Sequence, residues 1–436
     1  MDIRDKKIVI IGAKRSGMAL ARLVTSLNGK AGISEQGPED CLTEEFKDWA
    51  FAQDIASEFN GHTQQFVEEG DLVVLSPGVA FDAVPVAWVK DKGIPVLGEI
   101  EFAAQFCDKP IIAVTGSNGK TTVATLIRDI LVRAGHKPCL CGNVGFPFSE
   151  FVFDLDDNDF VVLEISSFQL ESVLDPASSF RTDAGNELGM EGFKPYIAVI
   201  LNFSQNHLDR HKDLGEYLEA KKRIFLNQES DDFAVLNHND PQLKSLVSTV
   251  RSQVVYFNSS SENEERANPN HSAVLKVGGI LGINEACCRE VFQEFKGVEH
   301  RLEKVSRLDG IDFINDSKAT TVEAARWALG SIDQPVVMIC GGRDKNIDFS
   351  PLADSVRRKV KKMYAIGEAR QKIRQAFESL TGFEECNGLE EAVIKARQSA
   401  SEGDCVLLSP MCASFDMFCD FEQRGRVFKE IVGRLK

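Results

Sequence analysis

The sequence predicts an α/β protein built on mostly parallel sheets, and three observations lead to this fold class. Short apolar runs of strand length recur along the chain, several of them end in Gly, Ser-Pro or Asn, and amphipathic stretches such as 120–134 and 385–401 lie between them. Strands that are buried on both faces of a parallel sheet have this uninterrupted apolar pattern. Alternation of such strands with helices is typical of βαβ units.

The expected strands fall into three groups. In chain order, they cover residues 7–12, 71–78, 111–116, 159–166, 196–202, 335–342 and 404–410. A chain of 436 residues is too long for one ordinary core, and the spacing of the groups predicts domains at 1–98, 99–300 and 301–436. The polar stretches 175–195 and 258–272 indicate an insert and a surface loop within the second group.

The composition limits the classes of function. A formal net charge of -16 argues against a general nucleic-acid or membrane-surface binder, although a local cluster of lysines can still bind an anionic ligand. The eleven cysteines are odd in number and form no C-x-x-C pair, which indicates thiols in a reducing compartment. The amino-terminal stretch has no secretory pattern, and the longest apolar runs are only strand-length. We expect a cytoplasmic protein without membrane insertion.

A phosphate-binding loop is the strongest chemical signal. In "TGSNGKTT", Gly116 and Gly119 permit positive φ and close backbone approach, and a helix that begins near Lys120 points its free N–H groups at the loop. Lys120 can reach the β- and γ-phosphates of a nucleotide, and Thr121 can offer its hydroxyl to Mg²⁺. The common P-loop has a glycine where this chain has Val114. We therefore expect a variant phosphate loop; the alternative is an ordinary strand–turn–helix corner.

A carboxylate ends the next predicted strand. Glu164 closes an apolar run, and ligands of open α/β sheets gather beyond the carboxyl ends of the strands. Glu164 is therefore placed to bind a second Mg²⁺ or its water shell. The alternative is a helix cap or a buried ion pair, because a buried carboxylate needs a partner.

Histidines and a basic cluster follow the strand after that. His207 and His211 are four residues apart, as in the zinc motif H-E-x-x-H, but Leu208 stands where that motif has its glutamate. Zinc proteolysis is therefore not expected. The basic cluster at 221–223 lies on a predicted helix, and such a charge run is usually a solvated face.

The amino-terminal loop offers a second anion site. Gly12 and Gly17 frame a turn after the first strand, but the dinucleotide fingerprint requires a glycine where this chain has Lys14. An NAD site is therefore disfavoured, whereas a helix amino terminus that holds a diphosphate remains open. The turn at 76–78 follows another strand and is either a ligand contact or structural.

The carboxyl-terminal group places three polar loops after apolar strands. Their candidate anion-binding residues are Lys318, Arg343, Lys345, Ser409 and Ser414. Each of them alone could be an ordinary surface residue, but three loops at the carboxyl ends of strands favour a ligand-binding rim.

Taken together, these stretches resemble the Mur ligase family over essentially the whole chain. The loop "TGSNGKTT" is similar to the one that Mur ligases share with folylpolyglutamate synthetases, and "LEISSFQLE", "LSPGVA" and "LLSPMCASFDMFCDFEQRG" are similar to the member that adds D-glutamate. The D-N-P-R motif of the member that adds a dibasic residue is absent, and Asn118 stands where the member that adds L-alanine usually has histidine. The resemblance implies a Rossmann-like first domain, a central P-loop-type ATPase domain and a Rossmann-like third domain.

The resemblance also implies a reaction and its participants. The reaction is ATP-dependent, ADP-forming ligation of D-glutamate to UDP-N-acetylmuramoyl-L-alanine through an acyl phosphate, a cytoplasmic step of peptidoglycan synthesis for the cell wall, by a monomer that uses ATP and two Mg²⁺ ions. The implied catalytic residues are Lys120, Glu164, His207 and Lys221, and the implied metal ligands are Thr121, Glu164, His207 and Lys221, the last as a carbamylated lysine.

The implied ligand contacts are more numerous. Those for ATP are Gly116, Ser117, Asn118, Gly119, Lys120, Thr121, Thr122, Arg301, Lys318 and Lys345. Those for the two other substrates are Gly12, Ser16, Gly17, Ser76, Pro77, Gly78, Asn143, Ser166, Gln169, Ser414 and Phe421.

Three positions depart from the family pattern, namely Asn206, Thr321 and Arg343, and the insert at 175–195 is longer than usual. These departures bear on the details of metal and nucleotide binding. The rival interpretations are another Mur-type or folylpolyglutamate-type amino-acid ligase, a non-catalytic nucleotide-binding regulator, and an NAD oxidoreductase.

Overall fold

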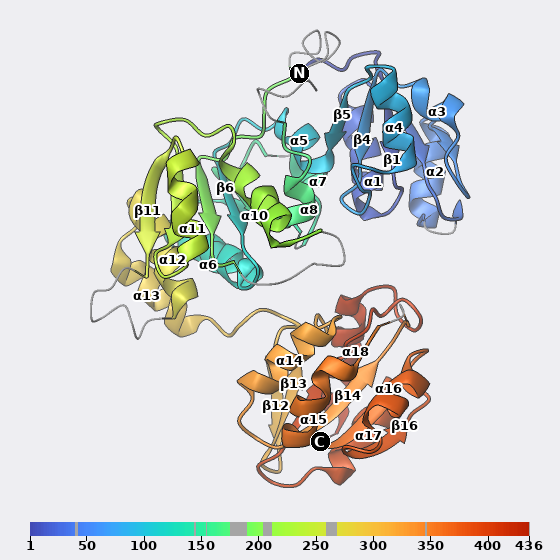
Figure 1. The fold of residues 1–436 in the computed structure, drawn as a ribbon, viewed down its shortest axis with the longest axis vertical. Coiled ribbons are helices and arrows are strands. Elements are labelled where there is room, and N and C mark those ends of the chain that lie inside the picture. The colour runs from blue at the N-terminus through green and yellow to red at the C-terminus, as the bar shows by residue number, and fades with distance from the viewer. Residues whose placement is uncertain are drawn as a thin grey trace. The chain divides into compact units, whose positions relative to one another are not determined.

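The computed structural model describes residues 1–39, 42–143, 145–153, 155–174, 190–203, 212–258, 268–344 and 347–435. The chain forms two compact units, Met1–Phe295 and Lys296–Lys436 (Figure 1). Among the described residues, the first unit contains a five-stranded and a six-stranded sheet, and the second contains one six-stranded sheet. The predicted α/β class with mostly parallel sheets is therefore confirmed.

The amino-terminal sheet is parallel throughout and has the strand order β3-β2-β1-β4-β5. Its strands are β1 (Lys7–Ile11), β2 (Lys30–Ser34), β3 (Ala56–Glu58), β4 (Leu72–Leu75) and β5 (Val96–Gly98), and its helices are α1 (Arg15–Ser26), α2 (Glu44–Ala52), α3 (Gln64–Glu68) and α4 (Val84–Asp91). In β1, Ile8 and Ile10 belong to the core on one face, and Val9 and Ile11 belong to the core on the other. Burial on both faces explains why the run is continuously apolar.

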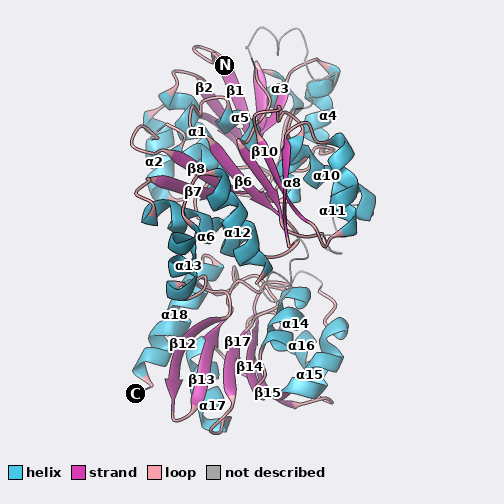
Figure 2. Cartoon of the chain, turned by 90° about the vertical axis from the view of Figure 1, so that its left-hand side faces the viewer, coloured by secondary structure: helices cyan, strands magenta, loops and turns pink. Residues whose placement is uncertain are grey.

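The central sheet is also parallel, with the order β11-β10-β9-β6-β8-β7. Its strands are β6 (Ile111–Thr115), β7 (Pro138–Gly142), β8 (Phe160–Glu164), β9 (Ile197–Ile200), β10 (Phe233–Asn237) and β11 (Gln253–Phe257). Its helices include α5 (Glu99–Ala104), α6 (Lys120–Arg133), α7 (Phe148–Phe151), α8 (Ser167–Leu170), α10 (Leu214–Lys222), α11 (Pro241–Ser245), α12 (Pro269–Ile280) and α13 (Glu285–Glu294). Helices α6, α12 and α13 pack together on one face of this sheet (Figure 2).

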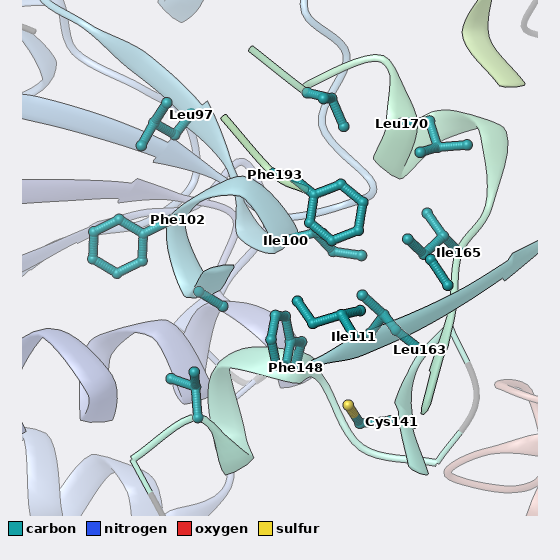
Figure 3. Close-up of a cluster of buried hydrophobic side chains, with 14 of the residues drawn as sticks. Leu97, Ile100, Phe102, Ile111, Cys141, Phe148, Leu163, Ile165, Leu170 and Phe193 are labelled. Carbon is teal, nitrogen blue, oxygen red and sulfur yellow. The ribbon is translucent and has the colours of Figure 1, made fainter. Parts of the chain in front are cut away.

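One hydrophobic core continues from the first sheet into the second. Ile8 and Leu72 of the first sheet belong to the same buried cluster as Leu163 and Ile200 of the second. Figure 3 shows part of this cluster, where Ile100 of α5 lies beside residues of the central sheet. This shared core accounts for the single compact unit, and the separation of 1–98 from 99–300 stays a prediction.

The carboxyl-terminal sheet has the order β12-β13-β17-β14-β15-β16, and only β12 runs antiparallel among the described pairings. Its strands are β12 (Glu303–Leu308), β13 (Ile311–Asn315), β14 (Val336–Gly341), β15 (Val360–Ile366), β16 (Gly382–Glu385) and β17 (Cys405–Leu408). Helices α14 (Val322–Ser331), α15 (Ala353–Lys359) and α16 (Arg370–Phe377) contribute to one core, and α17 (Leu389–Ser399) and α18 (Phe421–Arg434) contribute to the other.

None of the described helices is both long and apolar enough to cross a bilayer.

Candidate active site

The phosphate loop is shaped by two glycines in the left-handed region. Gly116 has φ +153° and Gly119, the N-cap of α6, has φ +84°. A Cβ at Gly119 would lie 2.7 Å from Asn270 Oδ1, and a Cβ at Gly116 would lie 3.0 Å from Leu201 Cβ. No side chain caps the amino terminus of this 14-residue helix, an arrangement that would suit an anion at its first N–H groups.

Two lysine amines converge on this loop. Lys120 Nζ donates to Gly116 O at 2.9 Å and to Ser117 O at 3.1 Å. Lys221 Nζ donates to the same Gly116 oxygen at 3.1 Å and to Thr115 Oγ1 at 3.3 Å. Lys221 is only 1% exposed, and its burial, followed by the positive charge of Lys120, holds the pKa of its amine well below the ordinary value.

The basic cluster at 221–223 therefore separates into three environments. Lys221 is buried and its amine lies 4.6 Å from the centroid of the Tyr217 ring. Lys222 pairs with Glu219 at the surface, as expected for a solvated charge. Arg223 donates to the backbone oxygens of Leu170, at 3.2 Å, and Val173. The expectation of a solvated face holds for Lys222 and is wrong for Lys221.

Oxygen ligands suited to Mg²⁺ lie at the carboxyl edge of the central sheet. Thr121 is 1% exposed, and its buried Oγ1 has no hydrogen-bond partner among the residues that the structure describes. Glu164 is fully buried at the end of β8, which pairs with β6 through Val114 and Glu164. Glu164 Oε1 accepts a hydrogen bond from Asn143 Nδ2 at 2.8 Å. Hydroxyl and carboxylate oxygens are the donors that Mg²⁺ prefers, so these residues fit the ion.

The other two predicted metal ligands, Lys221 and His207, have less direct support as ligands of Mg²⁺. The Lys221 amine is a hydrogen-bond donor to Thr115 and Gly116 and offers no oxygen to a cation in its unmodified form. His207 lies outside the described residues, as do His211 and Asn206.

The phosphate loop is hydrogen-bonded to Asn202, which follows β9. Asn202 accepts from Asn118 N through its Oδ1 at 2.9 Å and donates to Asn118 O through its Nδ2 at 3.1 Å. Ser117 N donates to Asn202 O, and Ser117 Oγ lies 3.2 Å from the Tyr217 hydroxyl. Thr122 is half-buried in the first turn of α6. The loop is thus fixed by hydrogen bonds before any nucleotide binds.

The amino-terminal loop is a close-packed turn at the carboxyl ends of β1 and β4. Gly12 has φ +95°, its oxygen accepts from Ser76 Oγ at 2.7 Å, and a Cβ at Gly17 would lie 1.9 Å from that same oxygen. Ser16 lies in the first turn of α1, which has no side-chain cap. Pro77 and Gly78 continue the turn with increasing exposure. These predicted contacts of the substrate therefore lie together.

The sequence-based prediction missed Glu35 at this loop. Its carboxylate accepts from Ala13 N at 2.6 Å and from Gly37 N at 2.8 Å. Glu35 directly follows β2, so its position after a strand was the available signal, although the strand itself was not predicted.

Ser166 and Gln169 form a capping box at α8. Ser166 Oγ accepts from Gln169 N at 3.2 Å, and Gln169 Oε1 accepts from Ser166 N at 2.9 Å. Their polar groups thus fix the turn that follows Glu164. The helix-cap alternative for Glu164 is wrong, because Ser166 holds that role.

Buried Glu101 and half-buried Asn227 bind the backbone of the same two residues, and we call this pair of side chains the clamp. The carboxylate of Glu101 accepts from the N–H groups of Leu174 at 3.0 Å and Phe193 at 2.8 Å. The amide of Asn227 donates to the carbonyl oxygens of the same two residues at 3.2 and 3.1 Å. Burial raises the pKa of Glu101 to about 8. Nothing in the sequence pattern predicted this clamp.

The carboxyl-terminal unit brings several predicted residues together around Arg424. Its guanidinium donates to Ser317 Oγ at 3.0 Å, Ser317 O at 2.8 Å and Cys412 O at 3.1 Å. Ser317 Oγ in turn donates to Phe421 O at 2.8 Å, and Lys318 Nζ lies 5.4 Å from the centroid of the Phe421 ring. Burial lowers the pKa of Arg424 to about 10. Ser414 is 2% exposed in the loop that precedes α18.

The remaining candidates of this unit differ in their partners. Ser409 Oγ donates to Asp316 Oδ2 at 3.0 Å. Arg301 is half-buried, and its Nε is buried without a hydrogen-bond partner among the described residues. Arg343 pairs with Glu368 at 3.3 Å, so its charge is balanced within the protein. Lys345 lies outside the described residues.

Each of the two compact units contains a segment that matches a known family. Residues 114–280 match the family described as Mur ligase middle domain, and residues 300–412 match the family described as Mur ligase, glutamate ligase domain.

Comparison with individual proteins extends the match to the whole chain. The UDP-N-acetylmuramoylalanine--D-glutamate ligase of Thermoanaerobacter sp. (strain X514) is 36% identical over 471 residues, with 100% of both chains covered. The ligase of the same name from Pelotomaculum thermopropionicum is 39% identical over 469 residues, with 100% of this chain and 99% of the relative covered. The crystal structure of UDP-N-acetylmuramate-alanine ligase MurC from Thermotoga maritima has a TM-score of 0.58 at 18% identity, covers 99% and 100% of the two chains, and supports the fold alone. Because full-length relatives at 36% and 39% identity accompany both domain matches, this chain belongs to the Mur ligase family.

Proposed function

We propose that this chain is an ATP-dependent ligase that joins D-glutamate to UDP-N-acetylmuramoyl-L-alanine in peptidoglycan synthesis. The observation that carries this function is the full-length similarity to D-glutamate ligases, at 36% and 39% identity. The phosphate loop, Lys120, Glu164 and Lys221 provide the chemistry that such a ligase requires.

The reaction needs activation of a carboxylate, because a carboxylate is a poor acylating agent. The carboxylate of the UDP-linked substrate attacks the γ-phosphorus of ATP, which forms an acyl phosphate and releases ADP. The amine of D-glutamate then attacks the acyl carbon, and inorganic phosphate leaves as the amide forms. Both steps bring anions together, so charge neutralisation and positioning dominate catalysis.

The residues of the phosphate loop would supply that neutralisation. Lys120 presently donates to two loop oxygens, and a bound nucleotide would offer its β- and γ-phosphate oxygens as stronger acceptors. The uncapped N–H groups of α6 would bind the same phosphates. Lys120→Ala should therefore abolish turnover, and unchanged product formation by this variant would contradict the mechanism.

Two Mg²⁺ ions are part of the proposal, and Thr121 and Glu164 would hold one of them. Such an ion would offset the negative charge of the phosphates. We propose His207 and a carbamylated Lys221 for the second. A depressed pKa favours the neutral amine that attacks carbon dioxide, and the product carbamate provides the oxygens that the bare amine lacks. Intact mass of the protein, with and without bicarbonate, tests this modification; an unmodified lysine together with bicarbonate-insensitive turnover would contradict it.

The remaining assignments concern the other ligands and the arrangement of domains. We propose that Lys318, Ser414 and Phe421 contact D-glutamate or the nucleotide, and that Arg301 and Lys345 contact ATP. The buried Nε of Arg301 supports an anionic ligand there. We further propose three domains, the first and third of them Rossmann-like, in a monomeric cytoplasmic enzyme. The order β3-β2-β1-β4-β5 supports the Rossmann-like first domain, and the ten described thiols, all free, support a reducing compartment.

The decisive experiment measures phosphate release with ATP, Mg²⁺ and UDP-N-acetylmuramoyl-L-alanine, with and without D-glutamate. Release that depends on both substrates, with a product heavier by one glutamyl residue by mass spectrometry, is the expected result. Release with another amino acid but not with D-glutamate would mean that the chain is a ligase of the same family with a different amino-acid specificity. ATP binding without turnover would favour a regulator.

A further inference from the structure

Three asparagines form a hydrogen-bonded ladder across the carboxyl edge of the central sheet. Asn202 follows β9, Asn237 ends β10 and Asn258 follows β11, and these strands are neighbours in the sheet. Asn258 Nδ2 donates to Asn237 Oδ1 at 3.3 Å, and Asn237 Nδ2 donates to Leu201 O at 3.2 Å. We call the three residues the asparagine ladder. Because Leu201 O belongs to the peptide that precedes Asn202, the ladder connects the end of β11 with Asn202.

Asn202 pairs with the phosphate loop in the way that a neighbouring strand would. β9 pairs with β6 as far as Ile200 and Thr115, and the loop follows. Ser117 N then donates to Asn202 O at 3.0 Å. The Asn202 side chain binds both backbone groups of Asn118, accepting at 2.9 Å and donating at 3.1 Å. An amide side chain carries both a donor and an acceptor, so it can supply the two hydrogen bonds of a strand residue.

Leu201, the residue before Asn202, packs against both glycines of the phosphate loop. A Cβ at Gly116 would lie 3.0 Å from Leu201 Cβ, and a Cβ at Gly119 would lie 3.4 Å from Leu201 Cδ1. Leu201 itself is 2% exposed. A loop that contains glycines loses much conformational entropy when it is ordered. The contacts of Leu201 and Asn202 therefore order a loop whose own sequence favours freedom.

The far end of the ladder is anchored in the core. Asn258 is 8% exposed and has φ +56°, a left-handed conformation that asparagine adopts more readily than most residues. Its N–H donates at 3.3 Å to Oγ of Ser272, a buried residue of α12. Asn237 Oδ1 also accepts from Asn239 N at 3.0 Å. The amide of Asn237 is therefore held from both sides and cannot rotate without losing hydrogen bonds.

The position of the ladder favours a role in ligand binding. Ligands of open α/β sheets bind beyond the carboxyl ends of the strands, and the ladder ends there, on the phosphate loop. The side chain of Asn202 is bound to the loop backbone, so it acts on the loop and not on a ligand. A loop that is already held in one conformation loses less entropy when a ligand binds to it.

We propose that Asn202 is a positioning residue for the phosphates of ATP and that Asn237 and Asn258 support it. The inference rests on the proposed function, which assigns the phosphate loop to ATP. Asn202 acts through the backbone of Ser117 and Asn118, which it holds in place. The ladder therefore strengthens the binding of the phosphates that reach the loop and leaves the rest of the nucleotide largely unaffected.

The test titrates the full chain with ADP and with AMP, which lacks the β-phosphate, by isothermal titration calorimetry. For Asn202→Ala we expect the Kd for ADP to rise about tenfold, because two hydrogen bonds to the loop are lost. The Kd for AMP should change less than about threefold. The matched control is Asn239→Ala, since Asn239 is exposed and gives the ladder only its backbone N–H, which alanine retains. This variant should change both constants less than about twofold.

Two further variants test the route through the ladder. Asn237→Ala should raise the Kd for ADP about threefold in the wild type and by a smaller factor in the Asn202→Ala background. Asn202→Asp keeps the acceptor for Asn118 N but places a carboxylate beside Asn118 O, so it should weaken ADP at least as much as alanine does, and less so at high salt. If Asn202→Ala does not fold, Asn237→Ala makes the same comparison of ADP with AMP.

The outcomes that would overturn the inference are distinct from failure of the proposed function. Equal ADP affinity in wild type and Asn202→Ala would overturn it, and so would a parallel loss of ADP and AMP affinity, which indicates general damage to the domain. An equal effect of Asn237→Ala in both backgrounds would remove the supporting role of the ladder. If the wild type binds ADP but does not ligate D-glutamate, the proposed function falls and the titrations still decide the role of Asn202. A wild type that binds no ADP would overturn the inference itself.

Discussion

The side-chain amines of Lys120 and Lys221 donate to the same backbone oxygen, that of Gly116, at 2.9 and 3.1 Å. Both amines therefore lie close together at the phosphate loop, one from α6 and one from α10. Burial, and after it the positive charge of Lys120, lowers the pKa of the Lys221 amine. The loop thus brings two amines together at the position where anionic phosphates are expected.

Lys221→Met should abolish turnover without lowering the melting temperature. The substitution removes a buried amine that is costly to charge, at the loss of two hydrogen bonds. Because the folded-state pKa is depressed, the wild type loses stability as pH falls from the ordinary lysine value of 10.5 to that pKa, so the relative stability of Lys221→Met should grow as pH falls over this range.

The measurements are kcat and thermal unfolding in bicarbonate-free buffer, with Lys222→Met as the control. Lys222 is the neighbouring lysine at the surface and pairs with Glu219, so its loss should change both quantities little. Retained turnover in Lys221→Met would remove Lys221 from the catalytic residues.

The phosphate loop could be predicted because its determinants are local. A strand, two glycines, a lysine and a threonine occur within one short stretch, and the structure places Lys120 and Thr121 at the start of α6 as expected. The burial of Lys221 beside half-buried Lys222 could not be predicted, because helical period alone does not reveal which face packs on the sheet.

Contacts between distant segments were also beyond the sequence patterns. Arg424 bonds to Ser317, which is 107 residues away, and Glu101 bonds to residues 73 and 92 positions away.

Edge strands were missed for a different reason. β3 (Ala56–Glu58) and β16 (Gly382–Glu385) lie at the edges of their sheets and contain no fully apolar run, so they lack the signal of a buried parallel strand.

Asn227→Ala should destabilise the first compact unit by about 2–4 kcal/mol. The change removes two hydrogen bonds and leaves the carbonyl oxygens of Leu174 and Phe193 without their side-chain donor. Urea denaturation of the full chain measures the effect on unfolding.

The matched control for this prediction is Asn158→Ala. Asn158 makes one exposed hydrogen bond to Lys137 O at 3.0 Å, and its loss should cost less than about 1 kcal/mol. Equal costs for the two variants would show that the clamp contributes no more than an ordinary surface contact.

Asp316→Asn should remove a pH dependence of stability. Burial raises the pKa of Asp316 to about 7 from 3.8, so its favourable contribution is complete below pH about 4 and is lost as pH rises through about 7. Asparagine can retain the bond from Leu302 N and donate to Ser409 Oγ, as the protonated acid would. Relative to wild type, the variant should gain stability between pH 5 and 8, by about 3 kcal/mol at most.

Thermal unfolding of both proteins at about pH 5, 6, 7 and 8, a range that spans the titration, measures this difference. Ser350→Ala is the control, because Ser350 is a surface residue of the same unit that bonds to the exposed Asp348. A melting-temperature difference between Asp316→Asn and wild type that does not vary with pH would contradict a raised pKa at Asp316.

Gly425→Ala tests the packing of α18 on the loop that precedes β12. A Cβ at Gly425 would lie 2.2 Å from His300 Nδ1, and His300 is 4% exposed and bonded to Asn315. The imidazole cannot move without breaking that bond, so the substitution should cost about 2–3 kcal/mol. Gly433 lies in the same helix with nothing within 4 Å of an added Cβ, and Gly433→Ala should be neutral or stabilise by up to about 1 kcal/mol.

A double-mutant cycle distinguishes this clash from a general intolerance of alanine at position 425. In the His300→Ala background the obstructing ring is gone, so Gly425→Ala should cost less than it does in the wild type, with a coupling of about 1–2 kcal/mol. Urea denaturation of the four proteins measures the cycle. Equal costs in the two backgrounds would mean that the obstruction at Gly425 comes from the helix itself rather than from His300.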